Sequence, residues 1–151
     1  MNSSILVTQS GLDSLKTNLV QMQNKRPQIV ERLSIARSMG DLSENSDYIN
    51  AREELDFLDS GIAELEELIK NSQVVLPSQN STISFGHTVT VQANSNKTSF
   101  QIVGEPEANP KDRKISHQSP LGMALMGKKV GDQVEVEAPV GKISYQIVAI
   151  A

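Results

Sequence analysis

Apolar residues in the first half of the chain recur at alternating intervals of three and four residues. The pattern runs as two adjacent rows up to Gly40, and a new pair of rows begins after it. This spacing is typical of a coiled-coil seam, so the sequence predicts two helices that fold back at the glycine as an antiparallel hairpin. The rows contain Leu12, Leu15, Leu19, Met22, Ile29, Leu33 and Ala36 before the glycine, and Tyr48, Ala51, Leu55, Leu58, Ile62, Leu65 and Ile69 after it.

Each arm of the hairpin has about 30 residues, which at ~1.5 Å per residue gives a reach of ~45 Å. Ser10, followed by Asp13, is expected to cap the first helix, and Pro27 is expected to bend it. Arg26 interrupts one of the apolar rows. A hairpin of this length cannot bury itself in a small compact domain, so we expect its far end to project into solvent or into a partner. A simple dimerisation coiled coil is the alternative.

The second half of the chain reads as β-rich. Its apolar segments alternate with polar residues or run for a few positions between glycines and prolines, which is typical of strands. We predict a small antiparallel sheet packed on one short helix, Leu121–Met126, and hence an α+β fold class for the whole chain. The expected division is a hairpin at 1–75, a linker at 76–81 and a second domain at 82–151. The predicted strands are Thr88–Val91, Phe100–Val103, Val134–Glu137 and Ile143–Val148.

Composition excludes several classes of protein. The 151 residues include no Cys and two His, so disulfides, thiolate zinc sites, thiol nucleophiles and Ser-His triads are excluded or disfavoured. The net charge is −4, which argues against a protein that coats free DNA. No apolar stretch approaches the roughly 20 residues of a membrane span, and no signal peptide is visible, so a cytoplasmic protein with no membrane association is expected.

The predicted corner of the hairpin carries two carboxylates, Asp41 and Glu44, three residues apart. One interpretation is structural: Asp41 caps the second helix and Glu44 completes a capping box. The other is that the two carboxylates help to bind a divalent cation such as Mg²⁺, which prefers oxygen ligands. Two exposed carboxylates do not hold Mg²⁺ tightly by themselves, so the remaining ligands of such a site must come from elsewhere.

Two arginines flank the acidic corner. Arg37 lies about one turn before it, and Arg52 lies about two turns beyond Glu44. Both are placed to reach a phosphate backbone. The alternative is ordinary ion pairing with nearby acidic side chains, for which the candidates are Asp47, Glu53 and Glu54.

Taken together, these segments resemble the Gre transcript-cleavage factors of bacteria. The corner sequence Gly-Asp-Leu-Ser-Glu-Asn-Ser-Asp-Tyr at 40–48 and the Ser-Pro-Leu-Gly segment at 119–122 are the most specific matches, and the similarity runs nearly end to end. The resemblance implies that the second domain has an FKBP-like fold. Further matching segments are Ala51–Glu53, Phe85–Val91, Ile102–Gly104 and Leu125–Asp132.

The resemblance also implies a function and a set of roles. A monomeric hairpin would enter the secondary channel of bacterial RNA polymerase, where Asp41 and Glu44 would assist a Mg²⁺ ion shared with the polymerase active site. Arg37 and Arg52 would contact the 3′ end of the nascent RNA. The isolated protein would bind no cofactor tightly and would not be an enzyme. Docking at the channel rim is expected to involve Ser119, Pro120, Leu121 and Gly122.

One residue departs from the family pattern, and two other functions stay open. Met123 stands where the family commonly has a basic residue, which is expected to weaken a polar contact at the docking surface. A channel-occupying inhibitor that does not promote cleavage is one alternative, although both tip acids are retained. A peptidyl-prolyl isomerase with a coiled-coil arm is the other, although the few aromatic residues are poorly suited to line a proline pocket.

Overall fold

The computed structural model describes residues 4–41, 44–78 and 81–151. Leu42 and Ser43 of the predicted corner, and residues 79–80 of the predicted linker, lie outside these ranges. The chain divides into two compact units. One unit is Leu12–Asn71, and the other joins the N-terminal residues up to Gly11 with Ser72–Ala151.

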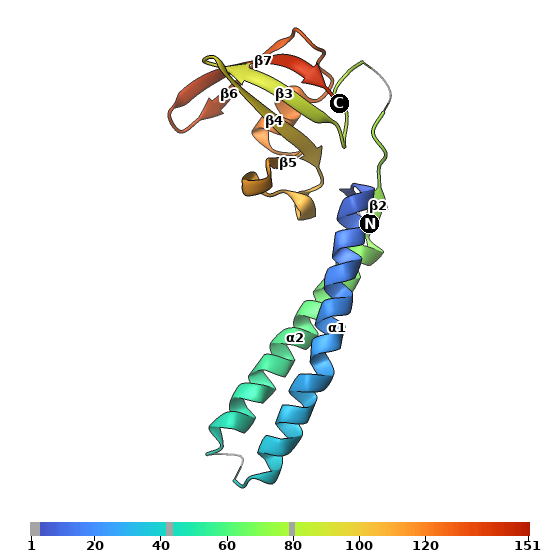
Figure 1. Cartoon of the computed structure of the whole chain (residues 1–151), viewed down its shortest axis with the longest axis vertical. Helices are drawn as coiled ribbons and strands as arrows, with labels where there is room; N and C mark the ends of the chain where they lie inside the picture. The colour runs from blue at the N-terminus through green and yellow to red at the C-terminus, as the bar shows by residue number, and fades with distance from the viewer. Residues whose placement is uncertain (1–3, 42–43, 79–80) are drawn as a thin grey trace. The chain divides into compact units, whose positions relative to one another are not determined.

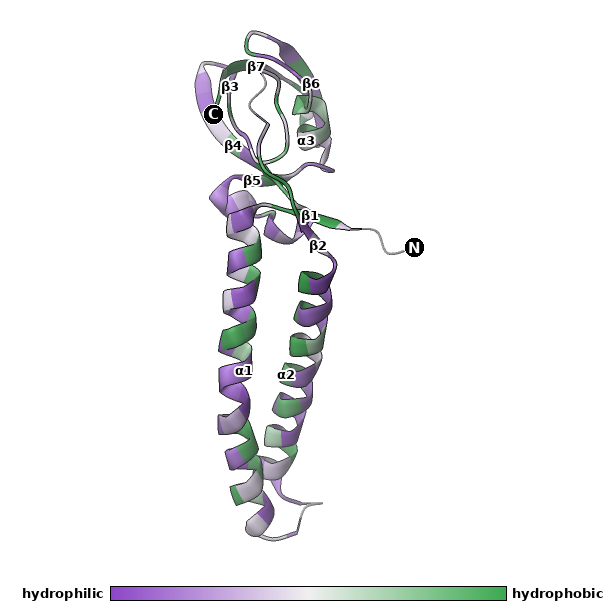
Figure 2. Ribbon diagram, turned by 90° about the vertical axis from the view of Figure 1, so that its right-hand side faces the viewer, coloured by the Kyte–Doolittle hydropathy of each residue, from purple (hydrophilic) through white to green (hydrophobic). Residues whose placement is uncertain are grey.

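Two long helices form the first unit. The helix α1 (Gln9–Ser38) and the helix α2 (Ser46–Lys70) run side by side in opposite directions (Figure 1). Hydrophobic and hydrophilic stretches alternate along both helices (Figure 2). The predicted antiparallel hairpin is therefore confirmed, and α1 continues through Pro27. The hydrophobic residues buried along the seam all belong to the predicted rows and are Ile29, Ala36, Ala51 and Leu58.

Arg26 breaks the apolar row because it reaches across the hairpin to an acid on the other helix. Its Nε and one terminal nitrogen donate to the two carboxylate oxygens of Asp59, at 2.8 and 3.2 Å. The hydrogen bond from Arg26 lowers the pKa of the Asp59 carboxyl below its ordinary value. Both side chains are partly exposed, so this forked pair adds little stability but favours one register of the two helices. A second pair, Arg32 with Glu54 at 2.8 Å, also joins the two helices.

The beginning of α1 differs from the prediction. The helix begins at Gln9, so Ser10 lies in its first turn and is not the cap. Thr8 takes that role, because its Oγ1 accepts a hydrogen bond from the Gly11 N–H at 3.1 Å. Thr8 in turn donates its N–H to Glu107 Oε2 at 2.8 Å and its hydroxyl to Glu107 Oε1. The capping residue is therefore held by a carboxylate 99 residues away in the sequence. No local sequence pattern reveals such a contact.

The second unit is built on a five-stranded sheet with the order β5-β4-β3-β7-β6. Four of its strands overlap the predicted strands, and β3, β4, β6 and β7 pair with one another in antiparallel fashion. The fifth strand, β5, was missed, and it pairs with β4 in parallel, so the sheet is mixed and not purely antiparallel. A strand of three residues is too short to show a hydrophobic period. The strands are β3 (Thr88–Ala93), β4 (Asn96–Val103), β5 (Lys114–Ser116), β6 (Gln133–Ala138) and β7 (Gly141–Ile150).

A single cluster of apolar side chains joins the sheet to the short helix α3 (Pro120–Leu125). Val89 and Val91 alternate along β3 and are completely buried, as expected when one face of a sheet is covered. The predicted α+β fold class is confirmed. Among the helices of the described residues, none combines the length and apolar character of a membrane span. The cluster consists of Ile83, Val89, Val91, Ile102, Leu125, Val134 and Ile147.

A two-stranded parallel sheet, β1 (Ile5–Val7) with β2 (Ser72–Val74), belongs to the second unit and was also missed. The backbone of β1 passes so close to Gly104 that a Cβ there would lie 1.7 Å from the Leu6 carbonyl oxygen. Only glycine allows this approach. The predicted boundaries put residues 1–75 in one domain, whereas these contacts group both ends of that range with the sheet, because strand pairing between distant segments leaves no local signal.

The turn η1 (Glu105–Glu107) supplies the carboxylate that holds Thr8. Glu107→Ala is expected to lower the free energy of unfolding of the second unit by about 1–3 kcal/mol, because two partly buried donors lose their charged acceptor. Chemical denaturation and amide exchange at Thr8 measure this. Glu105→Ala, an exposed change in the same turn, is the control and should stay within about 0.5 kcal/mol. Equal effects of the two substitutions would contradict this role of Glu107.

Candidate functional site

Asn45 closes the corner between the two helices. Its Oδ1 accepts a hydrogen bond from the Tyr48 N–H at 3.1 Å, which makes it the N-cap of α2. Its Nδ2 donates to the Ala36 carbonyl oxygen in the last turns of α1 at 2.6 Å. One side chain therefore satisfies an otherwise unpaired N–H group at the start of one helix and a carbonyl near the end of the other. Gly40, with φ of +137°, turns the chain just after α1.

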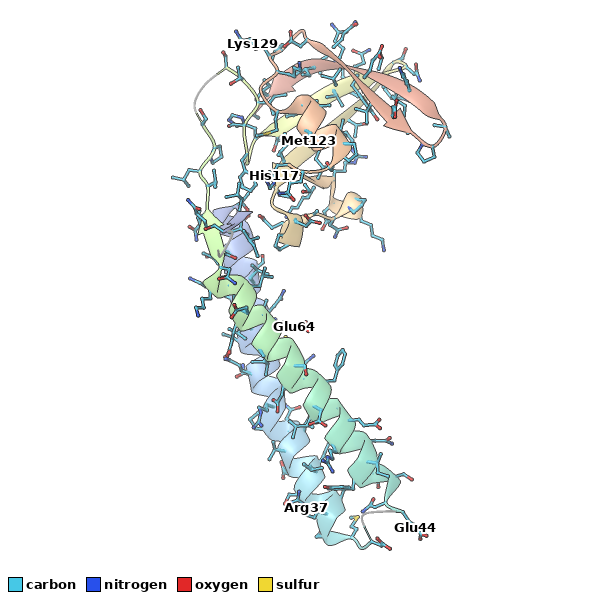
Figure 3. The ribbon with its side chains drawn as sticks, turned by 180° about the vertical axis from the view of Figure 1, so that it is seen from behind. Arg37, Glu44, Glu64, His117, Met123 and Lys129 are labelled. Carbon is cyan, nitrogen blue, oxygen red and sulfur yellow. The ribbon has the colours of Figure 1, made fainter. Side chains whose placement is uncertain are left out.

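Because Asn45 caps α2, the capping interpretation of Asp41 and Glu44 is wrong. Both acids lie before the cap, outside either helix, and both are exposed. Glu44 and Arg37 lie at the same end of the hairpin (Figure 3). The sequence placed the acids at the corner correctly. The capping interpretation named Asp41, whereas the N-cap is Asn45. Asn is also a preferred N-cap residue, so the sequence did contain an indication of the correct cap.

An open hollow of about 470 Å³ lies at this end of the hairpin. Asp47, in the first turn of α2, lines it together with the two predicted acids, whereas the sequence indicated Asp47 only as an ion-pair partner of the arginines. Within the ranges that the structure describes, no group of three or more His, Cys, Asp or Glu side chains is close enough to hold a metal ion. The oxygen donors present suit a hard cation such as Mg²⁺. The hollow is lined by Met39, Asp41, Glu44, Asn45, Ser46 and Asp47.

Arg37 and Arg52 lie on one face of the hairpin. The Arg37 guanidinium sits over the Tyr48 ring, 5.8 Å from its centroid, which is a cation–π contact between the two helices. Arg52 follows Tyr48 by four residues and so projects from the same side of α2. The apolar pattern predicts Tyr48 as a seam residue, but it gives no sign of the contact with Arg37.

The ion-pair interpretation of the two arginines is not supported. Glu54 pairs with Arg32 instead. Among the side chains that the structure describes, neither Arg37 nor Arg52 forms an ion pair, and both are exposed. Both guanidinium groups are therefore accessible to an anionic ligand.

The Ser-Pro-Leu-Gly segment forms the start of α3 and lies in the second unit, so it is not part of the site at the corner. Ser119 is the N-cap: its Oγ accepts from the Gly122 N–H at 3.0 Å and donates to the Ser116 carbonyl at 2.6 Å. Gly122 is buried, and a Cβ there would lie 2.1 Å from the Ser116 oxygen. Pro120 is exposed and Leu121 is partly buried, while the neighbouring Met123 is 62% exposed. Much of this segment is thus explained by local structure.

Comparison with known proteins identifies the class of this chain. Residues 5–74 match the family model for the N-terminal domain of transcription elongation factors, and residues 78–151 match the model for the C-terminal domain of GreA/GreB. The two models together span nearly the whole sequence. The chain belongs to the GreA/GreB family of transcription elongation factors.

Two GreA proteins agree with this assignment, and one solved structure is also similar to this chain. Transcription elongation factor GreA of Clostridium acetobutylicum is 41% identical over 150 residues, covering 96% of this chain and 95% of that protein. GreA of Lactococcus lactis subsp. lactis is 39% identical over 155 residues, covering 99% of each. A crystal structure of GreA factor homolog 1 of Thermus thermophilus is 26% identical, covers 98% of this chain and 99% of that one, and superposes with a TM-score of 0.46.

Asn45→Ala is expected to lower the free energy of unfolding of the hairpin by about 1–2 kcal/mol, because it removes the cap of α2 and the hydrogen bond that Asn45 Nδ2 donates to the Ala36 carbonyl oxygen. Asn45→Asp should lose less, because a carboxylate still accepts from the Tyr48 N–H. Thermal denaturation, monitored by circular dichroism, ranks the stabilities of the unmodified protein and the two variants. Asn24→Ala, an exposed change in the middle of α1, is the control; a loss there as large as that of Asn45→Ala would refute the capping role.

Proposed function

We propose that this protein stimulates RNA polymerase to cleave the 3′ end of nascent RNA in backtracked complexes. The observation that carries the proposal is the corner: Asp41 and Glu44 are exposed at the end of a hairpin of two long helices, and the N-cap of α2 is Asn45. The hairpin would enter the secondary channel of a bacterial polymerase and bring these carboxylates to the active site.

The acids at the corner fit the donor set of a shared magnesium site. Mg²⁺ takes about six oxygen ligands and usually keeps several waters, with one or two carboxylates and substrate phosphates completing the set. Asp41 and Glu44 would supply the carboxylates, and the polymerase and the RNA the rest. Bound there, the ion would stabilise the charge that develops on the attacking and leaving oxygens of the phosphodiester. A remaining carboxylate lone pair of either acid can accept a hydrogen bond from a water and so orient it.

The arginines would hold the extruded RNA. Phosphates are repelled by an acidic tip, so a factor that acts on RNA needs cations close to its carboxylates. Arg37 and Arg52 provide them on one face of the hairpin, and the contact with Tyr48 restrains the Arg37 side chain. A planar guanidinium can bind two phosphate oxygens at once, which favours an ordered RNA end.

The second unit would dock at the rim of the channel. Pro120 is the exposed member of the predicted Ser119–Gly122 segment, and the exposed apolar Met123 follows it in α3. In this proposal the protein acts as a monomer in the bacterial cytoplasm and is an accessory factor. The catalytic centre belongs to the polymerase, so the factor alone is expected to have no nuclease activity.

The direct test adds the purified protein to a stalled, backtracked elongation complex that contains labelled RNA and Mg²⁺. Shortened transcripts that regain the ability to be extended would support the proposal. Binding to the complex without shortened transcripts would refute it and favour the alternative of a channel-occupying inhibitor. The factor incubated with the same RNA but without polymerase is the control.

Asp41→Ala is expected to reduce stimulated cleavage by about 10–100-fold, as when metal ligation is disturbed, and to leave binding to the polymerase unchanged. Single-turnover cleavage and a competition binding assay measure the two effects separately. Asp56→Ala, which removes an exposed acid of α2 away from the corner, is the control. Cleavage by the Asp41 variant at the unmodified rate would show that the assignment of the tip is wrong.

Arg52→Glu is expected to weaken the response to extruded RNA more than it weakens docking, because it puts a negative charge where the RNA phosphates would lie. Cleavage of complexes backtracked by one and by several nucleotides would be compared at saturating factor, and binding measured separately. Lys16→Glu, an equivalent charge reversal near the other end of α1, serves as the control. Equal losses of binding and cleavage would point to a structural role for Arg52.

A further inference from the structure

A second hollow, a groove of about 240 Å³, lies between the two helices close to the corner. It shares Met39 and Asp47 with the acidic hollow, so the two form one continuous surface. The predicted metal ligands Asp41 and Glu44 do not line it, and neither do Arg37 and Arg52. The residues that line the groove are Arg32, Ile35, Ala36, Met39, Asp47 and Asn50.

The groove lies on the face of the hairpin opposite Arg37 and Arg52. Successive residues of an α-helix are ~100° apart, so Arg37 projects about 160° away from both Ile35 and Met39. On α2, Arg52 projects about 160° away from Asn50 by the same geometry. The contact between Arg37 and Tyr48 independently places these two side chains together on one face. The end of the hairpin is therefore two-sided.

The α1 wall of the groove is apolar and open to solvent. Ile35 is 49% exposed and Met39 is 71% exposed, whereas Ala36 between them is buried in the seam. Exposed apolar side chains that meet in a groove are characteristic of an interaction site. A cavity of about 150 Å³ already holds a benzene ring, so this groove is large enough for one bulky side chain.

Charge distinguishes between the possible ligands. Arg32 lines the groove, but its Nη1 is 2.8 Å from Glu54 Oε2, so its charge is balanced. The remaining charges here are Asp47 and the acids of the adjoining hollow, all negative. This surface repels phosphate and favours a cation beside an apolar group. An RNA chain fits the arginine face, and a protein segment with an apolar side chain next to Lys or Arg fits the groove.

We propose that this groove receives an apolar side chain of RNA polymerase, while a Lys or Arg next to that side chain pairs with Asp47. The inference rests on the proposed function, because it assumes that the hairpin enters the polymerase. Such a contact would restrict the rotation of the hairpin about its long axis. A rod held only at its base can turn about its long axis, and an anchor on one face of the tip would direct the opposite face, with Arg37 and Arg52, toward the RNA.

Ile35→Ser tests the anchor, and Ile49→Ser is the matched control, because Ile49 is an exposed isoleucine of α2 (41%) that does not line the groove. The concentration of factor that gives half-maximal cleavage is measured for each. Ile35→Ser should raise it about three- to tenfold, and Ile49→Ser less than twofold. Equal effects would overturn the inference. Circular dichroism checks that both variants keep the helical content of the unmodified protein.

A photo-crosslinking experiment identifies the ligand. The photoreactive residue p-benzoylphenylalanine is placed at position 35 or, as control, at position 49, and irradiated in purified backtracked complexes with labelled RNA. The expected result is a crosslink from position 35 to a polymerase segment that contains an apolar residue beside Lys or Arg. Crosslinking of position 35 to RNA, or to neither, would overturn the inference.

Failure of this inference is distinguishable from failure of the proposed function. The unmodified protein is assayed for stimulated cleavage in the same complexes. If it stimulates cleavage while Ile35 and Ile49 behave alike, the groove has no such role and the proposed function stands. If it stimulates no cleavage although position 35 crosslinks to the polymerase, the proposed function fails and the docking groove stands.

Discussion

The hairpin depends on one apolar seam between two helices. Its buried positions, such as Ala36 and Ala51, come from both helices, so neither arm can bury its apolar row without the other. Such a seam can be extended residue by residue without a globular core, which lets a short chain build a long projection. The stability of the hairpin comes from the length of the contact between the helices, so it does not depend on apolar packing at the corner. That freedom allows polar side chains to collect there.

At the corner, helix capping and the candidate functional site use different residues. A carboxylate that caps a helix uses its lone pairs on backbone N–H groups. Asn45 performs this task and also bonds to the preceding helix, so Asp41 and Glu44 are not needed to end or begin a helix. By themselves these two carboxylates do not hold Mg²⁺ tightly. Their chemical value would arise only where a partner supplies the cation and excludes solvent.

Charge is distributed unequally between the two arms. The helix α1 carries five basic and two acidic residues, and α2 carries two basic and eight acidic residues. The pairs Arg26–Asp59 and Arg32–Glu54 use part of this difference to hold the arms together. Near the corner, the charged side chains that are not in these pairs lie on two unlike faces. One face has accessible guanidinium groups, and the other has an apolar groove beside acids. Under the proposed function, the guanidinium groups would face RNA and the groove would face the polymerase.

Features that depend on neighbouring residues could be predicted from the amino-acid pattern alone: the seam, the corner, the position of its two acids, and four of the five sheet strands. Other features became visible only in the folded chain. The pairing of β1 with β2 and the contact of the Glu107 carboxylate with Thr8 each join residues far apart in the chain. The groove beside Ile35 joins side chains of two different helices. The physical reason is that periodicity records which side of an element is buried, whereas it holds no information about which distant segment covers that side.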